Sequence, residues 1–496
     1  MLKKVVIVDF GSQVTQLIAR SVRSQKVYCE VVPFNKFSLK YIKNENPVGI
    51  ILSGSPLSVT KRGFPSIKRE IFFLGIPILG ICYGMQLISS ALGGKIKKIS
   101  GREYGDTSIR VIKKSSICPN NWKTKTKHNV WMSHGDSVKT LPKNFISFAK
   151  SNNENFVGIA NEKMKIFGLQ FHPEVTHTKD GKSIIKKFLF EVCKCKPQWN
   201  MKKFKKENIT LLKKKLVNKK VICGLSGGVD SSVAALLLNK AIGKRLLCIF
   251  VDHGLLRMGE KQEIHNFFKK KSNFKFISVD ASKQFMKVLK GVTDPEKKRK
   301  LIGKEFIKTF DKCANKYKGI EYLAQGTLYP DVIESRSVTG APSATIKSHH
   351  NVGGLPKKMN LKLVEPLNTL FKDEVRILGK ELGLSDNIRN RHPFPGPGLA
   401  IRILGEVTKS RLEILRQADK IYIDLLKKEK LYDKIWQAFC VLLPVKTVGV
   451  MGDSRTYENV CAIRAVTSVD GMTADYYPFD QTFLKKISNN IINKVK

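Results

Sequence analysis

The sequence predicts an α/β protein, with two parallel-sheet α/β domains followed by a smaller α+β domain. Three observations support this prediction. Short β-branched runs alternate with helical stretches over residues 1–198, and the same alternation restarts near residue 220. A Pro- and Gly-rich segment at 392–400 then interrupts it. A chain of 496 residues is also too long for one hydrophobic core. We therefore expect domains at 1–198, 199–391 and 392–496.

The composition describes a folded and strongly basic chain. Hydrophobic residues make up 42% and charged residues 26%, proportions typical of globular rather than disordered proteins. The formal net charge of +48 would suit a nucleic-acid partner, because basic surfaces displace counterions from phosphates. The lysines are scattered, however, and no basic stripe interleaved with aromatic residues accompanies them. We interpret the charge as compositional drift and expect no specific nucleic-acid partner.

Cysteine usage and hydropathy indicate the compartment. The ten cysteines are scattered, and Cys193 and Cys195 lack the second pair that a zinc site needs. Asp9 interrupts the apolar opening before it reaches the length of a signal peptide. No apolar stretch is long enough to cross a membrane. The sequence therefore predicts a cytoplasmic protein with reduced thiols and no membrane association.

The first expected domain contains a cysteine in the setting of an activated nucleophile. Gly80 and Gly84 flank Cys82 between an apolar strand and a helical stretch. This spacing is that of the strand–turn–helix elbow in G-x-S-x-G enzymes, with Cys in place of Ser. The start of the helix favours a thiolate, and the backbone N–H of Tyr83 would face an oxyanion. The alternative is a buried structural cysteine between two glycines.

A histidine and a glutamate supply the other groups that a cysteine nucleophile requires. His172 and Glu174 are two residues apart at the end of an apolar strand, and a strand period of two would place both side chains on one face. The carboxylate would fix the tautomer of the histidine, which would deprotonate the thiol. The alternative is a strand-end histidine paired with a surface glutamate. Together with the elbow, these residues predict a triad of Cys82, His172 and Glu174.

The stretches GICYGMQ and FHPE resemble those of class I glutamine amidotransferases. The resemblance implies that Cys82 attacks the side-chain amide of glutamine and that ammonia leaves from a thioester. Ser133–Asp136 resembles the glutamine-site loop of that family, with a polar turn as the alternative. Ser55 stands where the family has a second glycine, and a positive φ there would cost about 1–3 kcal/mol. The implied oxyanion and glutamine-binding residues are Gly54, Ser55, Tyr83, Gln86, His134, Gly135 and Asp136.

The second expected domain opens with a Gly-rich loop between an apolar strand and an apolar helix. Backbone N–H groups in such a turn bind phosphates, and serine hydroxyls add donors. The loop lacks the Lys-Ser/Thr of a Walker A motif and instead resembles the S-G-G-x-D-S loop of ATP pyrophosphatases. A plain glycine turn is the alternative. The expected ATP-binding residues are Ser226, Gly227, Gly228, Val229, Asp230, Ser231, Ser232 and Asp252.

Two carboxylates in this region have separate expected roles, and Asp230 is the candidate for binding the Mg²⁺ that accompanies ATP. Asp230 lies within the loop, and hard carboxylate oxygens suit that ion. Asp252 ends the next strand, at the edge where parallel sheets bind nucleotides. A simple strand-end cap is the alternative for Asp252. The metal ligands themselves are not defined by the sequence, and no tightly bound organic cofactor is expected.

Longer stretches extend the resemblance over the whole chain. Residues 323–335, 346–356, 391–407 and 448–460 resemble the family of glutamine-dependent GMP synthetases. The resemblance implies an ATP-dependent carbon–nitrogen ligase that adenylylates xanthosine monophosphate (XMP) and aminates it with glutamine-derived ammonia. The products would be GMP, AMP and pyrophosphate. The family also implies a homodimer formed through the third domain. Implied XMP contacts are Arg299, Asp453 and Arg455, with Lys347 on a lid; surface ion pairs are the alternative for the arginines.

Two departures from the family pattern keep rival interpretations open. Family members continue past the region matching residues 491–495 with a short tail that adds a Lys and a Glu to the XMP site. The sequence ends at Lys496, so we expect either a truncated sequence or a depleted XMP site, as in an inactive homologue. His253 stands where Asn is common. A nucleic-acid-binding or tRNA-modifying protein is the other rival, because similar pyrophosphate loops occur in tRNA-modifying enzymes.

Overall fold

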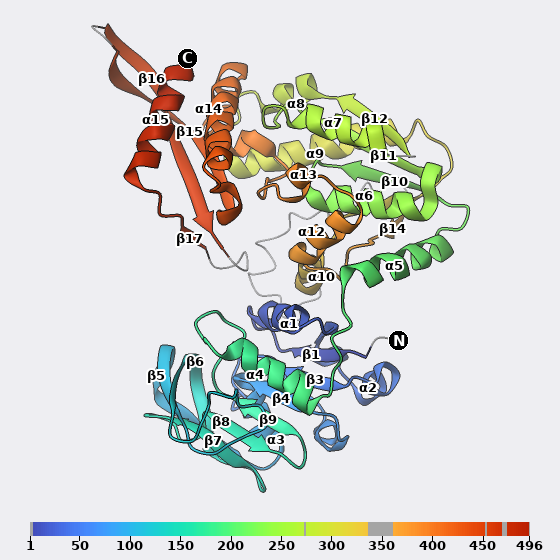
Figure 1. Ribbon diagram of the computed structural model, residues 1–496. Helices are drawn as coiled ribbons and strands as arrows, with labels where there is room; N and C mark the ends of the chain where they lie inside the picture. The colour runs from blue at the N-terminus through green and yellow to red at the C-terminus, as the bar shows by residue number, and fades with distance from the viewer. Residues whose placement is uncertain (1–2, 272–273, 336–360, 452–453, 469–473, 496) are drawn as a thin grey trace. The chain divides into compact units, whose positions relative to one another are not determined.

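The structure, a computed structural model, describes residues 3–271, 274–335, 361–451, 454–468 and 474–495 (Figure 1). Two compact units make up the chain, one built mainly from residues 1–200 and the other mainly from residues 201–496. Each unit contains a sheet with a parallel core, and the second also carries an antiparallel sheet near its C-terminus. The predicted α/β class is therefore confirmed. The finer division into three domains stays a prediction.

The first unit is built on a nine-stranded sheet with the order β2-β1-β3-β4-β9-β8-β7-β5-β6. Its parallel strands are β1 (Val5–Asp9), β2 (Cys29–Pro33), β3 (Gly49–Leu52), β4 (Ile78–Ile81) and β9 (Ile166–Leu169). Its antiparallel strands are β5 (Lys95–Val111), β6 (Lys127–Thr140), β7 (Ile146–Ser151) and β8 (Gly158–Asn161). Nearly every residue of the parallel strands is buried, as expected for a sheet covered on both faces.

Helices of the first unit connect these strands. The α-helices are α1 (Thr15–Ser24), α2 (Leu39–Glu45), α3 (Tyr83–Ala91) and α4 (Gly181–Lys187). Ser38 caps α2 by accepting a hydrogen bond from Tyr41 N, a standard N-cap arrangement. Helix α3 starts directly after β4, so its first turn lies at the carboxyl edge of the parallel strands. This placement brings the N-terminus of α3 to the edge where α/β proteins carry their sites.

The second unit contains a five-stranded parallel sheet with the order β12-β11-β10-β13-β14. The strands are β10 (Lys220–Leu225), β11 (Leu246–Asp252), β12 (Lys275–Asp280), β13 (Ile320–Ala324) and β14 (Lys362–Val364). Strands β11 and β12 extend the sheet on one side of β10, and β13 and β14 extend it on the other side. The direction of the strand order therefore reverses between β10 and β13. Doubly wound sheets bind ligands at the carboxyl edge of such a reversal.

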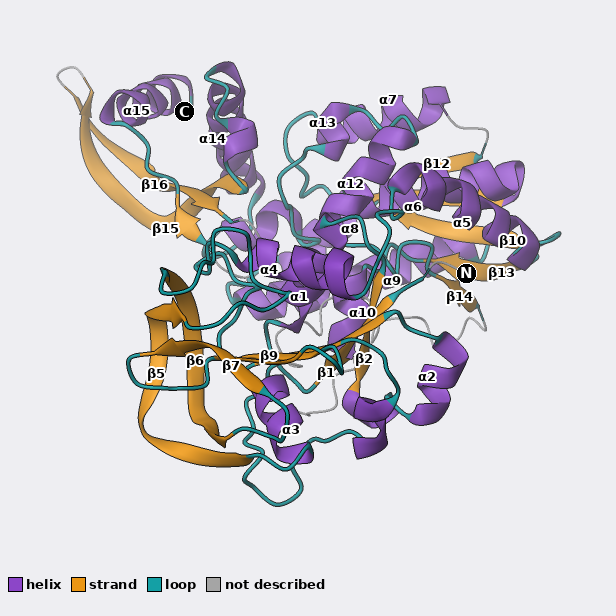
Figure 2. Ribbon diagram, turned by 60° about the horizontal axis from the view of Figure 1, so that its bottom comes forward, coloured by secondary structure: helices purple, strands orange, loops and turns teal. Residues whose placement is uncertain are grey.

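The antiparallel part of the second unit is a small sheet packed with two helices. Figure 2 shows its long ribbon, β15 (Gln437–Met451) and β16 (Ser454–Thr467), near α14 (Lys409–Lys428) and α15 (Gln481–Lys494). Strand β17 (Asp475–Tyr476) completes this sheet. The other helices of the unit are α5 (Met201–Lys215), α6 (Val229–Ile242), α7 (Glu260–Lys271), α8 (Ser282–Leu289), α9 (Pro295–Ala314), α12 (Lys372–Glu381) and α13 (Asp386–Arg389), and α10 (Tyr329–Ser335) starts in it.

One hydrophobic core joins the parallel and antiparallel parts of the second unit. Its buried members include Ile249 on β11, Leu415 on α14, Cys440 on β15 and Ile487 on α15. Apolar surface from both sheets is therefore removed from water in the same cluster. The two parts form a common interior, although their strand topologies differ.

A buried lysine also connects helix α9 to the segment that follows the Pro- and Gly-rich stretch. Lys298 Nζ donates to the carbonyl oxygens of Ala400 at 3.2 Å, Ile403 at 2.6 Å and Gly405 at 2.5 Å. The side chain is fully buried, and this burial lowers its pKa. Buried carbonyl groups without donors would cost about 1–3 kcal/mol each, so Lys298 stabilises this turn of the chain.

Candidate active sites

Cys82 occupies a strained turn between β4 and α3. Strand β4 ends at Ile81 and helix α3 begins at Tyr83, so Cys82 alone forms the connection. Its backbone angles are φ 51° and ψ −104°, a region that residues other than glycine rarely adopt. Such strain costs about 1–3 kcal/mol and is typical of nucleophile elbows. The predicted elbow geometry is therefore present in the structure.

The two glycines that flank Cys82 are required by close packing. A Cβ atom added to Gly80 would lie 2.5 Å from the carbonyl carbon of Gly84. A Cβ atom added to Gly84 would overlap the backbone carbonyl of Leu52 on β3. Neither position therefore accepts a side chain. The glycine pair lets α3 approach the sheet closely enough to place Cys82 at its carboxyl edge.

His172 and Glu174 form the hydrogen-bonded pair that the sequence predicts, although the reason for that prediction was wrong. His172 Nδ1 lies 2.7 Å from Glu174 Oε1, and Glu174 is fully buried at its side chain. Strand β9 ends at Leu169, so both residues lie in the following turn and not on one face of a strand. The turn at Pro173 brings the two side chains together. Thr178 holds the turn by donating its Oγ1–H to His172 O at 2.7 Å.

The surroundings of His172 favour its protonated form beside the thiol. Burial lowers the pKa of His172, but the Glu174 carboxylate and a hydrogen bond with Cys82 raise it, and the net pKa lies well above the usual value. An imidazolium in contact with Cys82 stabilises a thiolate. Gln170 Nε2 approaches Cys82 Sγ to 3.7 Å and adds a weak donor. The arrangement supplies a nucleophile, a base and a group that orients the base.

Replacing Glu174 with Gln should reduce glutamine hydrolysis about tenfold and shift its pH dependence. Because the carboxylate raises the pKa of His172, its loss lowers that pKa, and the imidazolium is then lost at a lower pH. The alkaline limb of the rate profile should therefore move to lower pH. The pH–rate profile of glutamate release, followed from about pH 5 to about pH 10, measures this shift, because these limits span the ordinary pKa values of histidine and cysteine. Glu191→Gln, an exposed carboxylate of the same unit, is the control.

The predicted oxyanion stretch lies next to the histidine. A Cβ atom at Gly54 would lie 3.4 Å from His172 Cε1, so this turn borders the triad. Ser55 is not among the described non-glycine residues with a positive φ, and the strain expected there is absent. Its hydroxyl oxygen accepts a hydrogen bond from Leu57 N at 3.1 Å. Tyr83 is the first residue of α3, so its N–H has no acceptor within the helix.

Residues 133–136 lie in strand β6, which corrects the predicted loop. His134 is paired with Glu103 and Ser133 with Tyr104 on the neighbouring strand β5. Strand β5 supplies partners for Ser133, His134 and Asp136, with a register shift at Gly135, and a local turn prediction cannot include such distant partners. The segment still borders the candidate nucleophile, since Cys82 Sγ lies 3.6 Å from Ser133 O.

Gln86 and His134 meet at one backbone carbonyl of this strand. Gln86 Nε2 donates to Asp136 O at 2.8 Å, and His134 Nδ1 lies 3.1 Å from the same oxygen. Both side chains are buried, and burial lowers the pKa of His134. Gly135 lies between His134 and Asp136 in sequence and has open space where a side chain would stand. These contacts connect helix α3 to the wall of the candidate glutamine site.

The Gly-rich loop of the second unit connects β10 to α6 at the reversal of the strand order. Ser226 Oγ and Ser231 Oγ lie 3.1 Å apart, and Ser232 Oγ donates to Gly228 O at 2.8 Å. Gly227 has φ +80°, which only glycine adopts without strain. Val229 and Asp230 begin helix α6, so their N–H groups point toward the loop. The loop therefore has the geometry of a phosphate cradle.

Two lysines that the sequence analysis missed neutralise the candidate carboxylates. Lys372 Nζ lies 2.6 Å from Asp230 Oδ2, and Lys261 Nζ lies 2.6 Å from Asp252 Oδ2. Asp230 Oδ1 is buried without a hydrogen-bond partner among the described residues. Gly326 follows β13 and approaches the loop, since a Cβ atom there would lie 3.1 Å from the carbonyl carbon of Asp230. The loops after β10 and β13 thus face each other at the expected edge.

The expected XMP contacts are only partly within the described chain. Arg299 lies on α9, where its Nη2 donates to Glu296 Oε1 at 2.9 Å, as in the surface ion-pair alternative. Arg455 is exposed on β16. Lys347 and Asp453 lie outside the described residues. Their roles stay predictions.

The described residues contain neither a cluster of metal-ligating side chains nor a helix suited to a membrane. No group of three or more His, Cys, Asp or Glu side chains in the described part of the chain could hold a metal ion. Among those same residues, no helix has the length and apolar character needed to cross a bilayer.

Comparisons with known proteins match three segments of the chain to families. Residues 6–192 match the class-I glutamine amidotransferase family, residues 202–316 the NAD synthase family, and residues 424–496 the GMP synthase C terminal domain. Over 492 residues the chain is 55% identical to a glutamine-hydrolysing GMP synthase from Brucella canis, covering 99% of this chain and 94% of that protein. Over 496 residues it is also 55% identical to one from Zymomonas mobilis, covering 100% of this chain and 94% of that protein. The chain belongs to the family of glutamine-hydrolysing GMP synthases.

Proposed function

We propose that the chain converts XMP to GMP with ATP and glutamine-derived ammonia, releasing AMP and pyrophosphate. The observation that supports this most strongly is the 55% identity to glutamine-hydrolysing GMP synthases over 99% of the chain. The geometry at Cys82, His172 and Glu174 adds physical support, because a strained elbow cysteine faces a histidine oriented by a buried carboxylate. The enzyme is thus an ATP-dependent ligase that takes its nitrogen from an amide.

The first unit would release ammonia by nucleophilic catalysis. The Cys82 thiolate attacks the amide carbon of glutamine, and the N–H of Tyr83 with the Gly54–Ser55 backbone stabilises the oxyanion. The C–N bond then breaks as His172 donates its proton to the leaving ammonia, which leaves a thioester on Cys82. A water molecule, deprotonated by His172, cleaves the thioester to glutamate and restores the thiolate. Glu174 keeps the ring oriented through both steps.

The second unit would activate XMP. The loop from Ser226 to Ser232 binds the phosphates of ATP, and a base oxygen of XMP attacks the α-phosphorus as pyrophosphate leaves. Ammonia then adds to the activated carbon, and AMP leaves with its oxygen. Arg299, Asp453 and Arg455 are the proposed XMP contacts, and Lys347 the proposed lid residue.

A Mg²⁺ ion is proposed to accompany ATP at this loop. The buried Asp230 Oδ1, which has no hydrogen-bond partner among the described residues, fits a hard cation. Asp230 would hold the ion, which would neutralise phosphate charge when bound. Its partner Lys372 and the nearby Lys261 contribute positive charge at the same edge of the sheet.

We further propose a homodimer and a cytoplasmic location. Several large apolar side chains on the antiparallel ribbon are exposed, among them Val445, Val448 and Tyr457 at 52%, 60% and 60%. Apolar groups clustered on one ribbon favour association with another surface. The ten cysteines are free thiols, as expected in a reducing compartment.

Measuring AMP release by the purified chain tests the proposed function. AMP and GMP should appear in equal amounts, and only when XMP, ATP and either glutamine or ammonia are present. A titration of the same preparation with tRNA serves as the comparison for the tRNA-modifying rival. ATP cleavage that ignores XMP, or that requires RNA, would contradict the proposal, and no cleavage at all would support an inactive homologue.

A further inference from the structure

A continuous series of polar contacts leads from Cys82 to the outer strand of the first unit. Gln170 Nε2 lies 3.7 Å from Cys82 Sγ, and Gln170 Oε1 lies 3.4 Å from Gln86 Nε2. Gln86 donates to Asp136 O, which His134 Nδ1 also approaches. The proposed reaction uses Cys82 as its nucleophile and gives no chemical step to Gln170, Gln86 or His134. The far end of the series is therefore unexplained.

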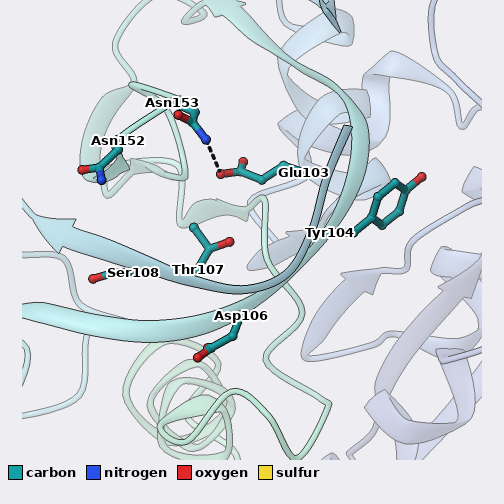
Figure 3. Close-up of a pocket in the computed structure, with 7 residues that line it drawn as sticks. All are labelled: Glu103, Tyr104, Asp106, Thr107, Ser108, Asn152 and Asn153. Atoms are coloured by element: carbon teal, nitrogen blue, oxygen red, sulfur yellow. Dashed lines mark hydrogen bonds between the residues drawn. The ribbon is translucent and has the colours of Figure 1, made fainter. Parts of the chain in front are cut away.

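Glu103 stands at that far end. It is the cross-strand partner of His134, and its Oε2 lies 3.1 Å from His134 Nε2. The two side chains are 10% and 1% exposed, so the contact is almost shielded from water. On its other side Glu103 lines an open polar cavity of about 330 Å³, where its Oε1 accepts a hydrogen bond from Asn153 Nδ2 at 3.3 Å (Figure 3). Glu103 thus separates His134 from this cavity.

The contacts of the imidazole fix its protonation. A carbonyl oxygen only accepts hydrogen bonds, so the nitrogen facing Asp136 O must carry a proton. A lone pair on the other nitrogen would repel a carboxylate oxygen at 3.1 Å. Burial lowers the pKa of His134, whereas the Glu103 carboxylate raises it by its charge and so favours a proton on Nε2. The two atoms lie at ion-pair distance, and neither has a hydrogen-bond partner among the described residues. This attraction holds the ring with Nδ1–H directed at Asp136 O.

We propose that Glu103 is a positioning residue of the amidase site and acts through His134. This inference rests on the proposed function, because it assumes that glutamine binds beside Cys82. Two donors, from His134 and Gln86, keep the 133–136 segment in place, and Ser133 O of that segment lies 3.6 Å from Cys82 Sγ. Without Glu103 the ring can turn, and the wall of the glutamine site loosens. The reaction with added ammonia does not use the glutamine site, so it should not depend on the contact between Glu103 and His134.

Kinetics of a double-mutant cycle tests the proposal. Glu103→Ala should raise the KM for glutamine about tenfold or more while changing kcat less than about threefold, since the loss concerns substrate placement. His134→Ala should have a similar effect. The double variant should be no more than about twofold worse than His134→Ala alone, because coupled residues are not additive. Additive losses, or a KM for Glu103→Ala within about twofold of the wild type, would overturn the proposal.

Conservative variants and a neighbouring carboxylate serve as controls. Glu103→Gln should keep the KM within about threefold, because its amide N–H can donate to the unprotonated ring nitrogen. Glu103→Asp keeps the charge but moves it away from His134, so the KM for glutamine should rise as in the alanine variant. This variant provides the test if Glu103→Ala does not fold. Asp106→Asn removes a charge from the same cavity without contacting His134 and should change nothing. A KM rise for Asp106→Asn equal to that for Glu103→Ala would count against a specific contact.

Separate assays distinguish failure of this proposal from failure of the proposed function. Glutamate release measures the amidase alone, and GMP formation from ammonia, XMP and ATP measures the second unit alone. All Glu103 variants should match the wild type in the ammonia assay. If the wild type makes no GMP from ammonia, the proposed function fails, whereas the glutamate-release cycle still decides the role of Glu103.

Discussion

Cys82→Ala should abolish glutamine-dependent GMP formation, with a loss of about 10⁴-fold or more, while ammonia-dependent formation stays within about twofold of the wild type. Alanine removes the sulfur that interacts with His172, and with it both the nucleophile and the thioester path. The second unit carries its own phosphate loop and receives free ammonia without help from Cys82. Parallel assays of GMP with glutamine and with ammonium chloride measure the two rates.

The control for this variant is another buried cysteine of the same unit. Burial raises the pKa of Cys118 to about 11, so this thiol stays protonated and unreactive near neutral pH. Cys118→Ala should therefore leave both nitrogen sources effective. In the wild type, iodoacetamide should label Cys82 before Cys118. Equal loss of the glutamine and ammonia rates in Cys82→Ala would contradict two separate sites.

Gly227→Ala should lower GMP formation about a hundredfold with either nitrogen source, while glutamate release by the amidase chemistry persists. The backbone at Gly227 has φ +80°, which alanine adopts only with strain, and the added Cβ would overlap the buried side chain of Ile264. The loop must then shift, and its N–H groups no longer match the phosphates. XMP-dependent AMP release is the direct measurement.

Gly243→Ala is the matched control at the other end of the same helix. Gly243 also has a positive φ, at 56°, but nothing lies within 4 Å of an added Cβ. This variant should lose about 1 kcal/mol of stability and keep AMP release within about twofold. A similar loss of activity in both variants would mean that helix destabilisation, and not the loop, causes the effect.

Local signals were sufficient for the elbow and for the loop. Close packing requires the glycines on either side of Cys82, and a positive φ requires glycine in the S-G-G-x-D-S pattern that starts at Ser226. Both requirements concern only the backbone near the motif. The pairing of His172 with Glu174 was also predictable, although the turn at Pro173 and not a strand produces it. In each case the interacting groups are close in sequence, so short patterns carry the information.

Contacts between distant segments could not be read from the sequence. The strand at residues 133–136 depends on β5, and the pairing of His134 with Glu103 spans a long hairpin. Lys372 reaches Asp230 across more than a hundred residues of chain. Polar residues such as these resemble turns or solvated surface in a one-dimensional pattern, and only the sheet order brings them together.

The common interior of the second unit has a consequence for how this half of the protein loses its structure. Ile249 and Cys440 belong to sheets of different topology but to the same buried cluster. Neither sheet can melt without exposing the apolar side chains of the other to water, so their heat denaturation is coupled in a single cooperative transition.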